Sequence, residues 1–354
     1  MRTINDLLRE ADEANASDIH VTGGRAPFLR IDGILKPVIE EKLSAQEVEA
    51  MIADLLGKDS RLTDELEQRK QVDFSYSIET GARFRINVFE QISGRSAAMR
   101  RVPAEIKTVE ELNLPPHILQ LSEKKQGFVL VTGPAGHGKS TTLAAMIEHI
   151  NIYRHEHIIT IEDPIEYIFS DQKSIIDQRE IGRDALSFAE AIRATLRQDP
   201  NVILVGEMRD PETMQAALTL AETGHLVFAS LHTNDAAQTV ERIIDTFQPA
   251  QQSQIRSQLA GMLTGIISQR LLPAAAGGRV PAVEILMATT AIRNAIREDK
   301  NHQIPGMIQT GSDKGMQTLE DSIKSLVNFG LVDKEMAAPY LLMQSAAPPG
   351  DKKK

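Results

Sequence analysis

The first hundred residues combine a helical and a strand pattern of hydrophobic positions. Apolar side chains recur at helical spacing from Ile4 to Ala11. Residues 74–78 and 84–88 each alternate strictly between apolar and polar side chains, and a Thr-Gly turn signal separates the two runs. This order predicts a small mixed α+β domain at residues 1–100.

Two further signals complete this first region. Ser44 and Glu47 have the spacing of a capping box and predict the start of a second helix. The predicted hairpin carries Arg83 and Arg85 on the face opposite its apolar side chains. A polar stretch around residues 100–107 then predicts an interdomain linker, which we place at residues 101–112.

From residue 113 the chain alternates between short apolar runs and helical segments. The helix that begins after Asp210 is well delimited, with Pro211 at its first position and Gly224 just beyond its end. Alternating β and α segments predict an α/β domain with a mainly parallel sheet, whose ligands bind at the carboxyl ends of the strands. The predicted strands are 128–132, 157–161, 202–205, 226–231 and 281–286.

This α/β domain is predicted to span residues 113–290. Residues 291–344 follow as a helical region. The final segment, 345–354, is low in complexity and rich in Pro and Lys, which predicts disorder.

A glycine-rich phosphate loop lies between the first strand and the first helix of the α/β domain. The order of strand, G-x-x-x-x-G-K-S loop and amphipathic helix is the context in which this pattern binds a nucleoside triphosphate. Lys139 adds a positive charge near the phosphates, and the Ser140 hydroxyl is a ligand for Mg²⁺. The expected ATP-binding residues are Gly133, Pro134, Ala135, Gly136, His137, Gly138, Lys139, Ser140 and Thr141.

Carboxylates follow two other predicted strands. Glu162 and Glu166 come just after one strand, where an ionised carboxylate can orient and deprotonate a water. Glu207 follows another, where P-loop enzymes hold Mg²⁺ or its water. The alternative is that these acids are solvated groups in ordinary turns.

His232 and His225 lie near a third predicted strand. A polar side chain there can sense the γ-phosphate, although a lone histidine is more often structural, and no metal-ligand spacing is evident. Arginines are abundant near these segments, and one or two of them supplied by a neighbouring subunit could act as arginine fingers.

Composition narrows the class of protein. The chain has 354 residues, which favours two domains, and it contains no cysteine. With no export signal and no apolar run long enough for a membrane span, a cytoplasmic location fits best. The net charge of −10 argues against a dominant nucleic-acid surface.

Four ordered motifs resemble those of the secretion-ATPase superfamily, which includes type II secretion and type IV pilus motors. They cover most of residues 127–245. The matches are Gly133–Ser140 with the Walker A loop, Ile161–Glu166 with the Asp box, Gly206–Asp210 with the atypical Walker B motif and Thr223–His232 with the His box.

The C-terminal region is similar to the pilus retraction ATPases of that superfamily. Residues 302–319 add to this likeness, and the four-cysteine module of extension ATPases is missing. The signature of the retraction ATPases is matched by Ala291, Ile292, Arg293, Asn294, Ala295 and Ile296, with Ala295 in place of the usual leucine. The phosphate loop departs from the family's common form at Ala135 and His137, and neither change removes a required group.

The resemblance implies a PAS-like N-terminal domain, a RecA-like P-loop ATPase domain and C-terminal helices, assembled as a homo-hexamer with ATP between the domains. It implies that Glu166 is the catalytic glutamate, that Glu207 and Ser140 hold Mg²⁺, and that His232 and His225 couple nucleotide state to neighbours. It also implies retraction at an inner-membrane pilus platform protein, with the motor at the cytoplasmic side of that membrane. The basic residues that match nucleotide-reaching positions are Arg83, Arg85, Arg100 and Arg101.

Three other functions remain open from the sequence. The first is an extension or type II secretion ATPase, which the missing cysteines disfavour. The second is a nucleic-acid translocase, which the acidic charge disfavours. The third is a nucleotide switch that does not hydrolyse, which the acids at the strand ends disfavour.

Overall fold

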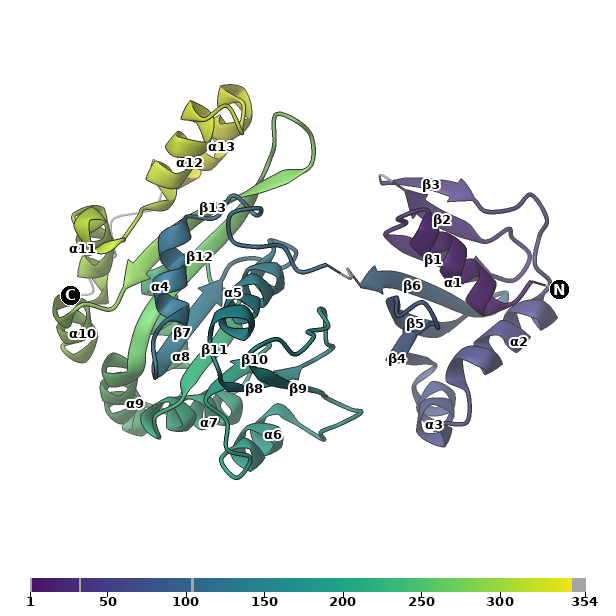
Figure 1. The fold of residues 1–354 in the computed structure, drawn as a ribbon, viewed down its shortest axis with the longest axis horizontal. Helices are drawn as coiled ribbons and strands as arrows, with labels where there is room; N and C mark the ends of the chain where they lie inside the picture. The colour runs from purple at the N-terminus through teal and green to yellow at the C-terminus, as the bar shows by residue number, and fades with distance from the viewer. Residues whose placement is uncertain (1, 32, 103–104, 346–354) are drawn as a thin grey trace. The chain divides into compact units, whose positions relative to one another are not determined.

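The computed structural model describes residues 2–31, 33–102 and 105–345. The chain forms two compact units, the first drawn in purple to blue and the second in blue to yellow (Figure 1). Of the tail predicted at 345–354, all but the first residue lies outside the described residues. The first unit comprises residues 1–105 with 166–168, and the second comprises 106–165 with 169–354.

The first unit is an antiparallel sheet packed against helices. Its strand order is β3-β2-β1-β6-β5-β4, and every neighbouring pair is antiparallel. Apolar side chains of α1, α2 and α3 share one hydrophobic core with the inner face of this sheet. The elements are α1 (Ile4–Glu13), β1 (Asp18–Thr22), β2 (Phe28–Ile31), β3 (Ile34–Pro37), α2 (Ala45–Leu56), α3 (Ser60–Arg69), β4 (Gln71–Ser77), β5 (Arg83–Gln91) and β6 (Gly94–Val102).

The predicted hairpin and both predicted helices of this unit are confirmed. β4 pairs with β5, and Phe84 and Ile86 are buried while Arg85 faces outward. Ser44 and Glu47 form the capping box at the start of α2. The structure corrects one detail, because β6 continues through Val102 as a paired strand. Residues 101 and 102, which we expected at the start of the linker, therefore belong to the sheet.

The second unit contains a seven-stranded sheet in the order β13-β12-β7-β11-β10-β8-β9. All neighbouring strands are parallel except the antiparallel pair β12–β13. The predicted α/β fold class is confirmed. The strands are β7 (Gly127–Thr132), β8 (His157–Glu162), β9 (Ile175–Glu180), β10 (Val202–Val205), β11 (Leu226–Leu231), β12 (Leu263–Pro273) and β13 (Arg279–Met287).

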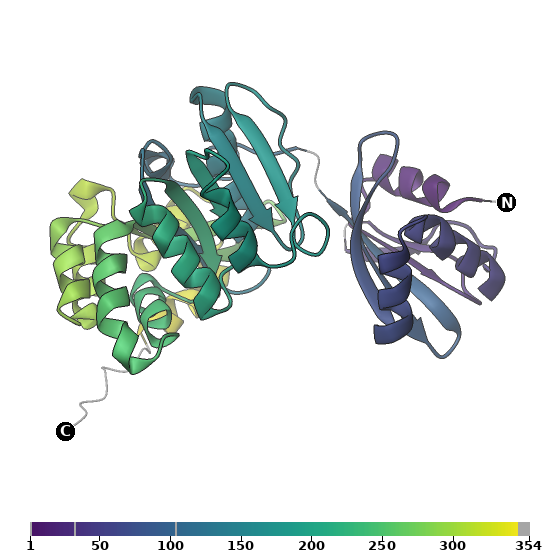
Figure 2. The same cartoon turned by 90° about the horizontal axis from the view of Figure 1, so that it is seen from below.

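Helices cover this sheet, as two views show (Figures 1 and 2). α9 packs against α7, α8 and α10, and side chains of these helices share one core with the strands. The predicted helical region after residue 290 is confirmed. The helices are α4 (Leu119–Ser122), α5 (Lys139–Tyr153), α6 (Phe188–Thr195), α7 (Pro211–Glu222), α8 (Ala236–Asp245), α9 (Pro249–Met262), α10 (Thr290–Arg297), α11 (Ile304–Gln309), α12 (Leu319–Asn328) and α13 (Lys334–Ser345).

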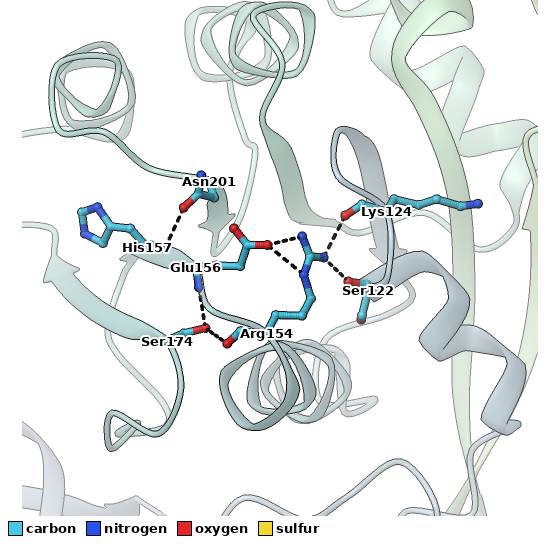
Figure 3. Close-up of polar contacts among 7 residues, drawn as sticks. All are labelled: Ser122, Lys124, Arg154, Glu156, His157, Ser174 and Asn201. Carbon is cyan, nitrogen blue, oxygen red and sulfur yellow. Dashed lines mark hydrogen bonds and ion pairs between the residues drawn. The ribbon is translucent and has the colours of Figure 1, made fainter.

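A polar network braces the amino end of β8 (Figure 3). The Arg154 guanidinium donates two hydrogen bonds to one carboxylate oxygen of Glu156, at 3.0 and 2.6 Å. It also donates to the backbone carbonyls of Ser122 and Lys124, and the Ser174 hydroxyl donates to the carbonyl of Arg154. The network joins the ends of α4 and α5 to the starts of β8 and β9. It fixes the edge of the sheet opposite the phosphate loop.

No helix within the described residues is both long enough and apolar enough to cross a membrane.

Candidate active site

The phosphate loop leaves the carboxyl end of β7 and enters α5 at Lys139. Every residue of β7 is buried, so the loop starts from a fixed point. Gly136 and Gly138 have φ values of 74° and 80°, which glycine adopts without a steric cost. A Cβ at Gly133 would lie 2.3 Å from the carbonyl oxygen of Gln269, so only glycine fits there. The loop therefore presents its backbone at the N-terminus of α5, the arrangement that binds phosphate.

The predicted loop lysine lies at the centre of a polar cluster. Lys139 Nζ donates to the carbonyls of Gly133 and Pro134, at 2.9 and 3.1 Å. It also lies 3.2 Å from Nδ1 of His232. Since an ammonium has no acceptor, Nδ1 accepts this bond and the proton of the neutral ring is on Nε2. That nitrogen lies 2.9 Å from a carboxylate oxygen of Glu207.

Residues of three motifs therefore meet at the carboxyl ends of β7, β10 and β11. Burial raises the pKa of Glu207, but a hydrogen bond from Arg209 and the charge of that guanidinium outweigh burial and lower it below its usual value. The same hydrogen bond raises the pKa of Arg209. Glu207 is thus a carboxylate near neutral pH, held beside Lys139.

The two predicted acids after β8 lie in different surroundings. Glu162 is the last residue of β8, is only 8% exposed, and accepts a hydrogen bond of 2.7 Å from the Thr160 hydroxyl. Glu166 is exposed and groups with the residues of the first unit. A cis Asp163–Pro164 bond separates the two. Glu162 therefore has a structural partner, and Glu166 has its carboxylate open to solvent.

The structure does not bring His225 to this cluster. His225 precedes β11, with Nδ1 3.0 Å from the hydroxyl of Thr223 and 3.0 Å from the carbonyl of Leu220 at the end of α7. His232 follows the same strand, so the two imidazoles lie at opposite ends of β11, about 20 Å apart at the usual rise of a strand.

The four predicted arginines all lie in the first unit. Arg83 and Arg85 are on β5, and Arg85 is exposed. Arg100 and Arg101, on β6, form ion pairs with Asp18 and Asp12 across the same unit. The Arg100 side chain nevertheless remains 73% exposed, whereas that of Arg101 is only 24% exposed.

A cleft of about 420 Å³ opens beside the phosphate loop. Thr141 at the start of α5 lines it together with Lys107, Asn113, Leu271 and Arg279. Its lining combines apolar and polar groups, which is typical of a small-molecule site. Among the residues that the structure describes, no group of three or more His, Cys, Asp or Glu side chains could hold a metal ion alone.

Sequence reasoning missed the residues that support the loop from β12. The Gln269 amide donates a bond of 2.8 Å to the carbonyl of His137, and the backbone N–H of Leu271 donates one of 3.0 Å to Nδ1 of the same histidine. No local pattern marks these partners, because they are 132 and 134 residues from the loop.

The predicted retraction signature forms α10. Ile292, Ala295 and Ile296 are buried, so most of its apolar positions serve the core. Arg293 donates to the carbonyls of Ala260 and Gly261 at the end of α9, and to that of Ala288 just after β13. The exposed members of the signature are Ala291 and Asn294.

The chain resembles known proteins over nearly its whole length. The family model described as type II/IV secretion system protein matches residues 1–337. The type IV pilus retraction ATPase PilT of Pseudomonas aeruginosa is 46% identical over 94% of this chain and 96% of its own. A twitching motility protein of Neisseria gonorrhoeae is 46% identical over 95% of this chain and 89% of its own. A crystal structure of the pilus retraction motor PilT with bound ADP matches with a TM-score of 0.89 and 46% identity, over 99% of this chain and 98% of that one.

Proposed function

This chain belongs to the family of type II/IV secretion system proteins, and from that premise we propose that it is a motor that hydrolyses ATP to retract a type IV pilus. The observation that carries the proposal is the meeting of Lys139, His232 and Glu207 at the carboxyl ends of three parallel strands. Relatives named for pilus retraction and twitching motility, each 46% identical, support retraction over extension or secretion.

The loop and the cleft divide the binding of ATP between them. Backbone N–H groups of residues 133–138 and the ammonium of Lys139 hold the β- and γ-phosphates. The base and sugar enter the adjacent cleft, where Thr141 and Arg279 offer polar contacts. Binding draws Lys139 from the carbonyls of Gly133 and Pro134 to phosphate oxygens, which are the stronger partners.

The residues that would hold Mg²⁺ are Ser140 and Glu207. A hydroxyl and an ionised carboxylate are the oxygen ligands that this ion prefers, and the lowered pKa of Glu207 keeps its carboxylate charged. When bound, the ion supplies positive charge that offsets the charge of the transferring phosphoryl group. Glu166, whose carboxylate is exposed, orients the attacking water, and buried Glu162 supports the end of β8.

His232 links the state of the nucleotide to the loop after β11. Its Nδ1 accepts a bond from Lys139 while Nε2–H donates to Glu207. When Lys139 turns to the γ-phosphate, His232 loses that donor and is free to reorient toward the nucleotide. A single phosphate thus changes the partners of both side chains.

The motor acts as a homo-hexamer at an inner-membrane pilus platform protein, on the cytoplasmic side of that membrane. The hexamer gives a role to residues that lie outside the cluster. His225 serves contacts with a neighbouring subunit, and the exposed Arg85 and Arg100 are candidates to reach a nucleotide. Arg83 and Arg101 are candidates for the same role.

The enzymatic part is tested with the purified full-length chain. Glu207→Gln should lower kcat about a hundredfold or more and leave nucleotide binding in place, since it removes the negative charge from the metal side of the site. Lys139→Ala should abolish binding. Glu212→Gln, an exposed acid in the first turn of α7, is the matched control and should behave as the unaltered protein. Full turnover in the Glu207→Gln protein would refute the assignment.

The motor part is tested in the cell. A strain lacking this chain should carry more surface pili than its parent and should not twitch. The Glu207→Gln gene should fail to restore motility, while the Glu212→Gln gene should restore it. A deletion strain without pili would instead support an extension ATPase.

A further inference from the structure

β12 continues beyond the end of β7 and runs beside the phosphate loop. The two strands pair as far as Ser268 and Thr132, whose hydroxyls are joined by a hydrogen bond of 3.0 Å. At Gly133 the chain of β7 turns into the loop, whereas β12 goes on to Pro273 in partnership with β13. The part of β12 beyond Ser268 therefore has one edge that faces the phosphate loop instead of a strand.

Gln269 is the first residue of this extension and is only 2% exposed. Its side-chain amide donates to the carbonyl of His137 at 2.8 Å, and its side-chain oxygen accepts from the hydroxyl of Thr142 at 2.6 Å. One buried amide thus spans the end of the loop and the first turn of α5. Both bonds are shielded from water, so the loss of either leaves a buried polar group without a partner.

The His137 side chain accepts a hydrogen bond from a backbone N–H on the same edge of β12. The N–H of Leu271 faces the side that β7 has vacated, and it donates to Nδ1 of His137 at 3.0 Å. The ring is therefore neutral, with its proton on Nε2. From β13, the Arg279 guanidinium donates to the carbonyl of Gly136 at 3.2 Å. Consecutive loop residues are thereby tied to the β12–β13 hairpin.

We propose that Gln269 and His137 are positioning residues that latch the phosphate loop to β12 and hold it in its binding shape before a nucleotide arrives. Gly136 and Gly138 give the loop its shape but also leave its backbone free to adopt others. Without the latch only part of the population has the binding-competent loop, and the apparent dissociation constant rises in proportion. The proposal rests on the proposed function only in assuming that this loop binds ATP.

The same strand also reaches the loop that carries His232. The Arg270 guanidinium donates to the side-chain oxygen of Asn234 at 3.1 Å. Neighbouring residues of β12 therefore contact both the phosphate loop and the loop that carries His232. Loosening the latch should affect the site from one side only, because Arg270 keeps its own contact.

The test compares two substitutions of one residue. In His137→Asn, the side-chain oxygen replaces Nδ1 as the acceptor for the Leu271 N–H; in His137→Ala, there is no acceptor. We measure the dissociation constant of a fluorescent ADP analogue, and KM and kcat for ATP, on the full chain. Loss of one neutral hydrogen bond predicts a three- to tenfold rise in the dissociation constant for His137→Ala, roughly the range for such bonds. His137→Ala should raise KM for ATP more than it lowers kcat. His137→Asn should restore most of the nucleotide affinity.

Gln269→Leu provides a second perturbation, and His149→Ala provides the control. Gln269→Leu removes both amide bonds and should weaken nucleotide binding at least as much as His137→Ala. His149 is another partly buried histidine; it packs on Tyr153 and lies in the second half of α5, ten residues beyond Lys139. Its loss should leave the dissociation constant unchanged. Melting temperatures without nucleotide show whether each variant is folded.

Two results would overturn the latch. One is an unchanged dissociation constant in His137→Ala, and the other is a His137→Asn protein as weak as His137→Ala. If Gln269→Leu does not fold, the two His137 variants still test whether the latch exists. An unaltered protein that binds no nucleotide would instead refute the proposed function, so the two failures are distinguishable.

Discussion

Glu284 is a largely buried carboxyl group on β13, and its replacement by glutamine tests how the second unit accommodates a charge there. Its Oε1 accepts a hydrogen bond of 2.8 Å from the backbone N–H of Ala236, at the start of α8. Burial raises the pKa of Glu284 from 4.5 to about 7, the bond from Ala236 opposes this rise, and the charge of Asp235 adds to it. Glu284→Gln keeps an oxygen that can accept from Ala236 but cannot ionise.

The expected gain follows from that pKa. Between pH 4.5 and about 7 the folded protein binds a proton at Glu284 that the unfolded chain has released, so stability falls as the pH rises through this window. The penalty is complete above pH 7 and absent below pH 4.5. A shift of this size corresponds to about 3 kcal/mol, at 1.36 kcal/mol for each pH unit. Glu284→Gln should therefore raise the free energy of unfolding by up to about 3 kcal/mol at pH 8.

Urea unfolding of the full-length protein, with and without the substitution, measures this difference at pH 8 and pH 5. The gain at pH 8 should shrink to less than about 1 kcal/mol at pH 5, which lies only slightly above the pKa of the unfolded chain. Asp235 is present in both proteins, so its own titration affects the two urea unfolding curves to a similar extent. The reasoning is refuted if the variant is less stable at pH 8, or if the difference does not change with pH.

Two further substitutions test polar contacts away from the site. Arg154→Met removes the bonds to Glu156 and to two backbone carbonyls, and should lower the free energy of unfolding by about 2 kcal/mol, as expected for hydrogen bonds to a charged group; unaltered urea unfolding would contradict this. Arg293→Ala leaves the carbonyls of Ala260 and Gly261 without their donor and should cost about 1–2 kcal/mol. A melting temperature equal to that of the unaltered protein would show that water replaces the guanidinium there.

The sequence predicts elements well where one chain segment carries the whole signal. β7 and α5 are predictable because a short apolar run, a glycine loop and a helical repeat follow one another. β12 was missed, since its residues follow α9 without a turn signal and mix apolar with polar positions. β9 was missed because it is an edge strand in which Asp177 and Arg179 interrupt the apolar run.

The functional site also has parts that the sequence predicts and parts that it does not. The proximity of Lys139 and Glu207 was expected, because carboxyl ends of parallel strands share one edge of a sheet. The latch at His137 depends on the pairing of β7 with β12, which no local pattern encodes. The separation of His225 from His232, by contrast, is predictable, because the expected strand 226–231 already lies between them.

The pairing of β7 with β12 also determines when, during synthesis, the phosphate loop can adopt its folded conformation. Gly133 leaves the ribosome long before Gln269, and the strand that flanks the loop on one side comes from the last third of the chain. Contacts so distant in sequence form late, because the intervening chain must first be ordered. A nascent chain that ends before β12 therefore has the whole glycine motif but lacks the contacts that Gln269 and Leu271 make with the loop. Nucleotide affinity should appear only once the final strands are joined, which makes ATP binding a marker of completed folding in this protein.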